Sequence, residues 1–207
     1  MKPRGSAIST AQIVRAFTAA ALLLCGCARP ASEAGAAADG SAGAAGGGAA
    51  APDAFLSARL RGALDADLAW RAADLQCEGG ARPDGRGIRV SLAGPLADGR
   101  RLRLVFGLAA EPGTAAARAV PANVTLIVEG ANRVYATLGD DKCSVDALTQ
   151  QPVGAGAEGD YWVSARGFCI GPAATLDRAE RVLLSRFDFR GRIHVDSDVP
   201  RPRGGTG

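Results

Sequence analysis

His194 is the only histidine in the chain and the first candidate for a general acid or base. In a Ser–His–Asp hydrolase it would be the base, and Asp188, Asp196 or Asp198 would orient its ring. Many such enzymes present the serine on a sharp turn, and the sequence contains no Gly-x-Ser-x-Gly segment. We therefore predict that the chain is not an enzyme and has no catalytic residue. His194, on the polar face of a strand, is kept as a candidate ligand-binding residue.

Aspartates are the second group that could do chemistry. Three pairs are close enough in sequence for their carboxylates to lie together: Asp65 and Asp67, Asp140 and Asp141, and Asp196 and Asp198. Calcium takes six to eight oxygen ligands, and no EF-hand-like loop is present to supply them. Arginines at 59, 61, 190 and 192 are near neighbours, so we predict solvated ion pairs, no metal site and no cofactor. A glycosidase carboxylate pair stays open, because spatial separation decides it.

Aromatic side chains could stack on the apolar face of a sugar ring. Trp70 falls at an inward-facing position and is predicted to lie in the core, whereas Trp162 faces away from its neighbour Tyr161. Aromatic residues make up only 5% of the chain, which is few for a carbohydrate platform. Trp162 therefore joins His194 as a candidate ligand-binding residue, for a glycan or a divalent metal.

The N-terminus resembles a bacterial lipoprotein signal peptide. Basic residues precede an apolar run over 16–24, and Leu24-Cys25-Gly26-Cys27 follows it. Only 13 residues separate Arg15 from Arg29. As a helix they would reach about 20 Å, short of the roughly 30 Å of the hydrocarbon core. The resemblance implies cleavage before Cys27, acylation of Cys27 and attachment to a membrane through that lipid.

Two alternatives to this processing remain open. Leu22-Leu23-Leu24-Cys25 would move the lipid to Cys25, although it places a bulky leucine at the cleavage site. An ordinary secretory signal would leave no lipid at all. Residue 28 is alanine rather than aspartate, which by resemblance to proteobacterial sorting rules implies the outer membrane.

The net charge of +3 comes from 24 basic and 21 acidic residues. Cleavage would remove Lys2, Arg4 and Arg15 and no acid, so the mature chain would be neutral. Nucleic-acid binding needs a basic face to neutralise phosphates. The sequence indicates none beyond Arg201 and Arg203 near the C-terminus, and we predict no nucleic-acid partner.

Three cysteines would remain besides the lipidated one. An oxidising envelope permits a disulfide, and we predict that Cys143 pairs with Cys169, since both lie in segments that could be neighbouring strands. Cys77 would then be buried and inert, or free for another partner. Neither a Cys-x-x-Cys spacing nor a nearby histidine favours a metal site.

The chain divides into four predicted parts: a signal peptide at 1–26, a lipidated Cys27 with a flexible tether to 52, a globular domain at 53–200, and a disordered tail at 201–207. The tether is almost entirely Ala, Gly, Ser and Pro, with no large apolar side chain. It would span roughly 25–30 Å as a coil.

Period-two alternation of apolar residues predicts the fold of the globular domain. It occurs over 88–92, 101–108, 124–128, 134–138, 161–167 and 187–195, and it also fits 58–70, where leucines every four residues make a helix a rival. Residues 172–181 are predicted to form a short helical turn. We expect a single all-β domain, an antiparallel β-sandwich or barrel-like structure of about eight strands.

This domain also resembles uncharacterised cell-envelope lipoproteins of Gram-negative bacteria. The resemblance rests on four short motifs: Cys77-Glu78-Gly79, Arg82-Pro83-Asp84-Gly85, Pro121-Ala122-Asn123-Val124-Thr125 and Gly167-Phe168-Cys169. These motifs look structural and imply no activity. The sequence thus predicts a non-enzymatic, lipid-anchored envelope protein that binds another envelope protein or has a structural role, with a glycan- or metal-binding module as the alternative and an envelope hydrolase third.

Overall fold

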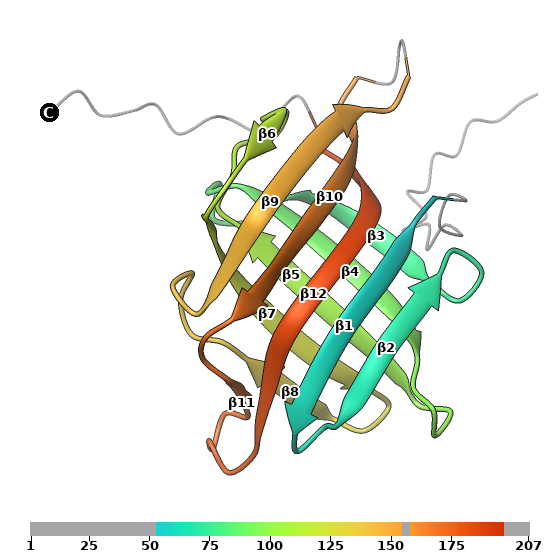
Figure 1. The fold of residues 1–207 in the computed structure, drawn as a ribbon, viewed down its shortest axis with the longest axis vertical. Helices are drawn as coiled ribbons and strands as arrows, with labels where there is room; N and C mark the ends of the chain where they lie inside the picture. Colours follow the sequence, from blue (N-terminus) through green and yellow to red (C-terminus); the bar gives the residue numbers. More distant parts are fainter. Residues whose placement is uncertain (1–52, 155–157, 197–207) are drawn as a thin grey trace, which may run out of the picture. The chain divides into compact units, whose positions relative to one another are not determined.

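The computed structural model describes residues 53–154 and 158–196. These residues form an all-β domain with no helix among them (Figure 1), which confirms the predicted fold class. The predicted signal peptide, Cys27, the tether, Asp198, residues 197–200 and the tail at 201–207 lie outside the described residues. None of the described residues belongs to a helix long and apolar enough to cross a membrane.

The described chain forms strands that pair antiparallel with one another throughout. Their bounds are β1 (Phe55–Gly62), β2 (Ala66–Arg71), β3 (Gln76–Ala81), β4 (Ile88–Pro95), β5 (Arg101–Leu108), β6 (Ala116–Ala117), β7 (Val120–Glu129), β8 (Arg133–Ala136), β9 (Cys143–Pro152), β10 (Asp160–Cys169), β11 (Ala173–Ala174) and β12 (Arg181–His194).

The strands lie in two layers of one folded sheet. One layer has the order β2-β1-β12-β10-β9-β6, and the other has the order β3-β4-β5-β7-β8 (Figure 1). The start of β7 pairs with β9 and joins the layers at one corner. The short strand β11 pairs with both β8 and β12 and joins them at another.

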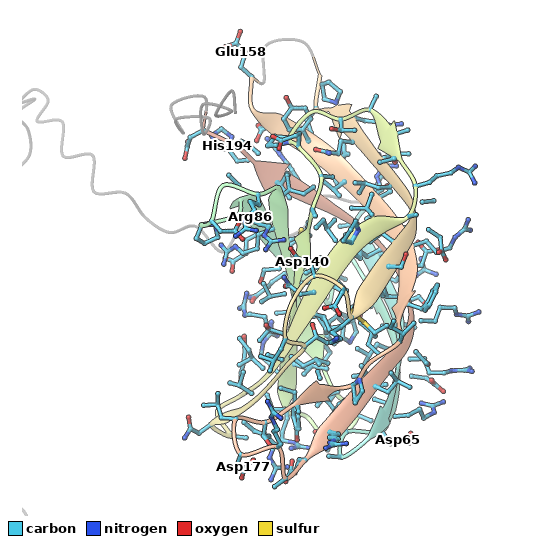
Figure 2. All side chains as sticks on the ribbon, turned by 90° about the vertical axis from the view of Figure 1, so that its left-hand side faces the viewer. Asp65, Arg86, Asp140, Glu158, Asp177 and His194 are labelled. Carbon is cyan, nitrogen blue, oxygen red and sulfur yellow. A yellow bond between two sulfur atoms is a disulfide. The ribbon has the colours of Figure 1, made fainter. Side chains whose placement is uncertain are left out.

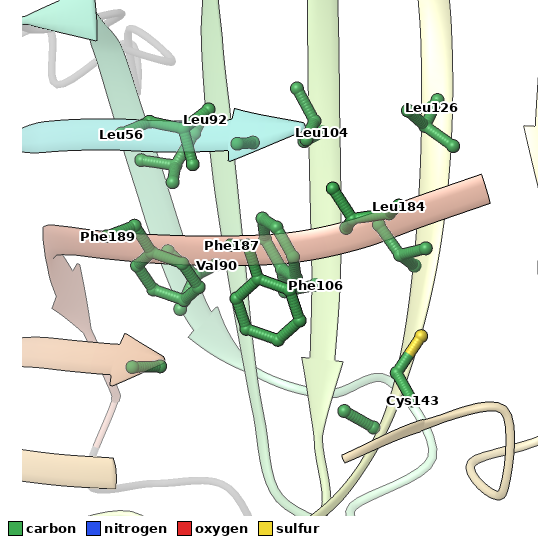
Figure 3. Packing of buried hydrophobic residues seen from close by; sticks show 14 of the residues in the cluster. Leu56, Val90, Leu92, Leu104, Phe106, Leu126, Cys143, Leu184, Phe187 and Phe189 are labelled. Atoms are coloured by element: carbon green, nitrogen blue, oxygen red, sulfur yellow. The ribbon is translucent and has the colours of Figure 1, made fainter. Parts of the chain in front are cut away.

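The core lies between the layers and is built from the alternating apolar residues. Leu102, Leu104 and Phe106 of β5 face inward and are at most 1% exposed. Phe106 packs against Phe187 and Phe189 of β12, with ring centroids 4.9 and 4.7 Å apart (Figure 3). These three rings therefore hold the two layers together at the centre of the domain.

Two predicted details are settled by strand pairing. Residues 55–71 form the β1–β2 hairpin rather than a helix, with Leu56 opposite Trp70 and Leu60 opposite Ala66. The helical turn predicted over 172–181 is wrong, because Ala173 and Ala174 pair with neighbouring strands and a turn follows them. Trp70 is 5% exposed, as its inward position predicts, and its ring N–H donates to the carbonyl of Pro95 at 2.8 Å.

Two of the four short motifs meet at Asp140, which Figure 2 labels. The Arg82 guanidinium lies 3.1 Å from both carboxylate oxygens of Asp140, and it also pairs with Asp84 at 2.8 Å. The Asn123 amide donates to Asp140 as well, at 2.5 Å. The arginine side chain is only 11% exposed, so this network ties the β3–β4 turn to β7 and the β8–β9 loop. Asp140 is therefore an ion-pair partner, although its partner is the largely buried Arg82 rather than one of the four arginines that the sequence suggested.

The predicted disulfide between Cys143 and Cys169 is present. The two residues are directly opposite each other at the ends of β9 and β10. Cys77 is a free thiol whose Sγ lies 3.3 Å from the carbonyl oxygen of Arg192. Burial raises the pKa of this thiol to about 11, so it is protonated and unreactive at neutral pH.

Candidate functional site

The candidate site lies on the outer face of the β2-β1-β12-β10 sheet. Along these four strands the inward positions are apolar, so the charged residues project outward. They comprise eight arginines and one histidine against three aspartates. Figure 2 shows long side chains with nitrogen ends projecting from one side of the molecule. A chain expected to be neutral overall therefore has a locally basic face.

Toward one end of this face lies a cluster of cationic and aromatic side chains, called here the basic aromatic patch: Phe55, Arg71, Trp162, Arg190 and Arg192. Phe55 is directly opposite Arg71 on one side and Arg190 on the other. Trp162 is directly opposite Arg192. Strand register thus brings together residues from four strands.

Cation–π contacts order the basic aromatic patch. The guanidinium carbon of Arg190 lies 4.9 Å from the Trp162 ring centroid, and that of Arg71 lies 6.0 Å from the Phe55 centroid. Such contacts contribute about 0.5–1 kcal/mol at exposed sites. Neither arginine forms a salt bridge with any described residue. Their guanidinium groups are therefore positioned by aromatic rings and keep their charge available for a partner.

A second cluster surrounds Asp160 at the beginning of β10. Its carboxylate accepts a hydrogen bond from Arg192 at 2.6 Å, and its other oxygen lies 3.0 Å from Nδ1 of His194. Nε2 of His194 lies 3.2 Å from a carboxylate oxygen of Asp196. The hydrogen bond from Arg192, and after it the His194 ring, hold the pKa of Asp160 below its ordinary 3.8.

This arrangement favours the charged form of His194. Ionised carboxylates only accept hydrogen bonds, and a neutral imidazole has only one N–H to donate, so only the imidazolium satisfies both Asp160 and Asp196. The hydrogen bond to Asp160 accordingly raises the pKa of His194 above its ordinary 6.5. Both ring nitrogens face carboxylates, so neither is directed at a nucleophile in the way a hydrolase requires.

The pKa of His194 gives a direct test of this cluster. In untagged protein the single histidine should titrate above 6.5 in an NMR experiment, and Asp160→Asn should lower its pKa. Asp146→Asn, at an exposed position of β9, is the control and should leave it unchanged. Because the folded pKa is raised, the histidine stabilises the fold fully below pH 6.5 and loses that contribution as the pH rises through the folded pKa. A midpoint at or below 6.5 in the wild type would contradict the geometry.

The other aspartate pairs do not join this cluster. Asp65 and Asp67 both contact Arg61, and Asp67 also contacts Arg59, so they form the predicted solvated ion pairs. Asp65 and His194 lie at opposite ends of the molecule (Figure 2). Within the part of the chain that the structure describes, no group of three or more His, Cys, Asp or Glu side chains is arranged to hold a metal ion.

A hollow of about 560 Å³ lies at the other end of the domain. The β1–β2 turn and the β4–β5 turn line it, with Trp70, Asp98 and Arg100 among its residues. Asp98 and Arg100 form an ion pair with each other at 2.6 Å. Neither Trp162 nor His194 lines this hollow. The charges of Asp98 and Arg100 already neutralise each other, so this pair leaves no net charge to attract a ligand.

The structure therefore brings together both predicted ligand-binding residues, Trp162 and His194, on adjacent strands. Sequence reasoning missed Phe55, Arg71 and Asp160, which join them only through register. One signal was visible in the sequence, since Arg186, Asp188, Arg190, Arg192 and His194 alternate with buried residues along β12. That spacing predicts a row of charged side chains on one face of a strand. It does not predict which strands lie beside it.

Comparisons of this chain with protein-family models, with curated proteins and with solved structures each found no match.

Proposed function

We propose that this chain is a lipid-anchored protein of the bacterial cell envelope, held at Cys27 in the outer membrane, and that its β domain is a non-enzymatic binding module. The structural observation that carries the binding role is the basic aromatic patch. Two arginines without salt-bridge partners among the described residues are held over aromatic rings there. Fixed, unneutralised cations at the surface suit recognition of an anionic partner.

The alternative of glycan binding through Trp162 has less support. Sugar rings stack on an open aromatic face, and the Trp162 ring already has the guanidinium of Arg190 over it at 4.9 Å. A sugar would have to displace this arginine or use the opposite face. The third candidate, a hydrolase with His194 as base, is disfavoured because both ring nitrogens face carboxylates.

The anchor is tested by acyl labelling in a Gram-negative host. We expect the wild type to incorporate labelled palmitate and to fractionate with membranes, and Cys27→Ser to do neither. Cys25→Ser is the matched control and should behave as the wild type, because that residue leaves with the signal peptide. Continued labelling of Cys27→Ser, or loss of labelling in Cys25→Ser, would contradict acylation at Cys27.

A further inference from the structure

We propose that the basic aromatic patch docks the domain on a membrane surface rich in anionic, phosphate-bearing lipids. The inference deepens the proposed function and rests on it in one respect, namely that the chain works beside a membrane. The added claim is that the outer face of the β2-β1-β12-β10 sheet binds the lipid headgroups of that membrane.

The charge of the outer face favours an anionic partner. Of its eight arginines, Arg59 and Arg61 are compensated by aspartates of the β1–β2 hairpin, and Arg192 pairs with Asp160. Arg71, Arg190 and the exposed Arg186 form no salt bridge with any described residue. A guanidinium matches phosphate oxygens with two parallel hydrogen bonds, which a lysine ammonium cannot do. Apart from His194, all basic residues of this face are arginines.

The aromatic members of the patch suit a headgroup layer. Phe55 and Trp162 are half-buried at the outer surface of the sheet. Tryptophan side chains are favoured where one end of a side chain is apolar and the other is hydrated, as at a membrane interface. The same geometry disfavours single-stranded nucleic acid, which stacks its bases on open aromatic faces, because the arginines lie over these rings.

The position of the patch along the chain also favours a membrane. β1 begins at Phe55, itself a member of the patch. In the sequence a segment of only 27 residues, 28–54, separates Phe55 from Cys27, the proposed lipid site. A domain held by this segment would keep the patch within reach of the headgroups.

Vesicle co-sedimentation tests the proposal without the lipid anchor. The protein is the mature chain, residues 27–207, carrying Cys27→Ser, and the vesicles are phosphatidylcholine with or without phosphatidylglycerol. We expect binding only to vesicles that contain phosphatidylglycerol, and loss of binding as salt is added. Arg71→Gln with Arg190→Gln should weaken binding roughly 30-fold, since each basic residue near an anionic surface contributes about a factor of five.

Controls separate charge at this face from charge in general. Arg86→Gln with Arg89→Gln removes two exposed arginines from the other layer and should leave binding unchanged. Because Arg190 is half-buried, Arg71→Gln with Arg186→Gln removes two exposed arginines instead and should weaken binding in the same direction. Thermal melting of every variant establishes that it is folded.

Four results would overturn the proposal: equal binding to both kinds of vesicle, no binding to either, equal loss in the control variant, or tighter binding to a DNA oligonucleotide than to anionic vesicles. None of them depends on acylation of Cys27. Failure of the lipid anchor would appear only in the labelling experiment, so the two failures are distinguishable.

Discussion

Replacing Phe106 with alanine should lower the free energy of unfolding by about 4 kcal/mol, because phenylalanine-to-alanine changes in a core typically cost 3–5 kcal/mol. The ring is 1% exposed and contacts Phe187 and Phe189 from the opposite layer. Its loss removes two aromatic contacts between the layers and leaves a cavity at the centre of the core. Urea unfolding would measure the change as a lower midpoint with an unchanged slope.

Val105→Ala is the matched control. Val105 is the adjacent residue of β5, but it faces outward and is half-buried. We expect a loss of about 1 kcal/mol or less from this change. If Phe106→Ala cost no more than Val105→Ala, the two layers would not pack through these rings and the described core would be wrong.

Loss of the Cys143–Cys169 disulfide should lower the free energy of unfolding by about 3.5 kcal/mol, since opening the loop restores chain entropy to the unfolded state. The sequence separation of 26 residues sets the size of that loop. For a domain of this size the loss corresponds to a fall in melting temperature on the order of 10 °C. Thermal melting of the wild type with and without dithiothreitol measures the effect.

The double variant Cys143→Ala, Cys169→Ala controls for other effects of the reductant. Its melting temperature should be low and unaffected by dithiothreitol, because Cys77 forms no disulfide. A wild type whose melting temperature does not change on full reduction would mean that the bond contributes little to stability.

The strands that were predicted correctly have large apolar residues at every second position. β5 is an example, since Leu102, Leu104, Phe106 and Leu108 all proved to be buried. The positions between them hold Arg103, Val105 and Gly107, each charged or smaller than leucine, so the large apolar residues recur at every second position. The pairing of Cys143 with Cys169 was also predictable, because both residues lie in segments that could be neighbouring strands.

Two of the longer strands, β3 and β9, carry no clear period-two signal, for physical reasons. β3 approaches β12 so closely that a Cβ atom on Gly79 would lie 2.5 Å from the Ile193 side chain, and one on Gly80 would lie 2.6 Å from a backbone oxygen. Small residues are required there, and they carry no hydrophobic alternation. In β9 a bulge between Val145 and Leu148 shifts the parity of the inward residues, so the pattern breaks in mid-strand.

The site was only partly predictable, because it depends on register between strands distant in sequence. Trp162 and His194 were recognised as candidates from their residue types and polar positions. Phe55 lies opposite Arg190 because β1 pairs with β12. These two strands are far apart in the sequence, and no local pattern predicts that they pair. The basic face was missed because net charge is a sum over the whole chain, and most of the compensating acids lie in loops away from these strands.

The most direct test of the proposed anchoring is the mass of the N-terminal peptide of the protein purified from membranes. We predict a peptide that begins at Cys27 and carries a diacylglycerol and a further acyl chain, as in the bacterial lipoproteins that the N-terminus resembles. A peptide that begins at another residue, or one with Cys27 unmodified, would contradict the proposal that this domain works from a lipid anchor.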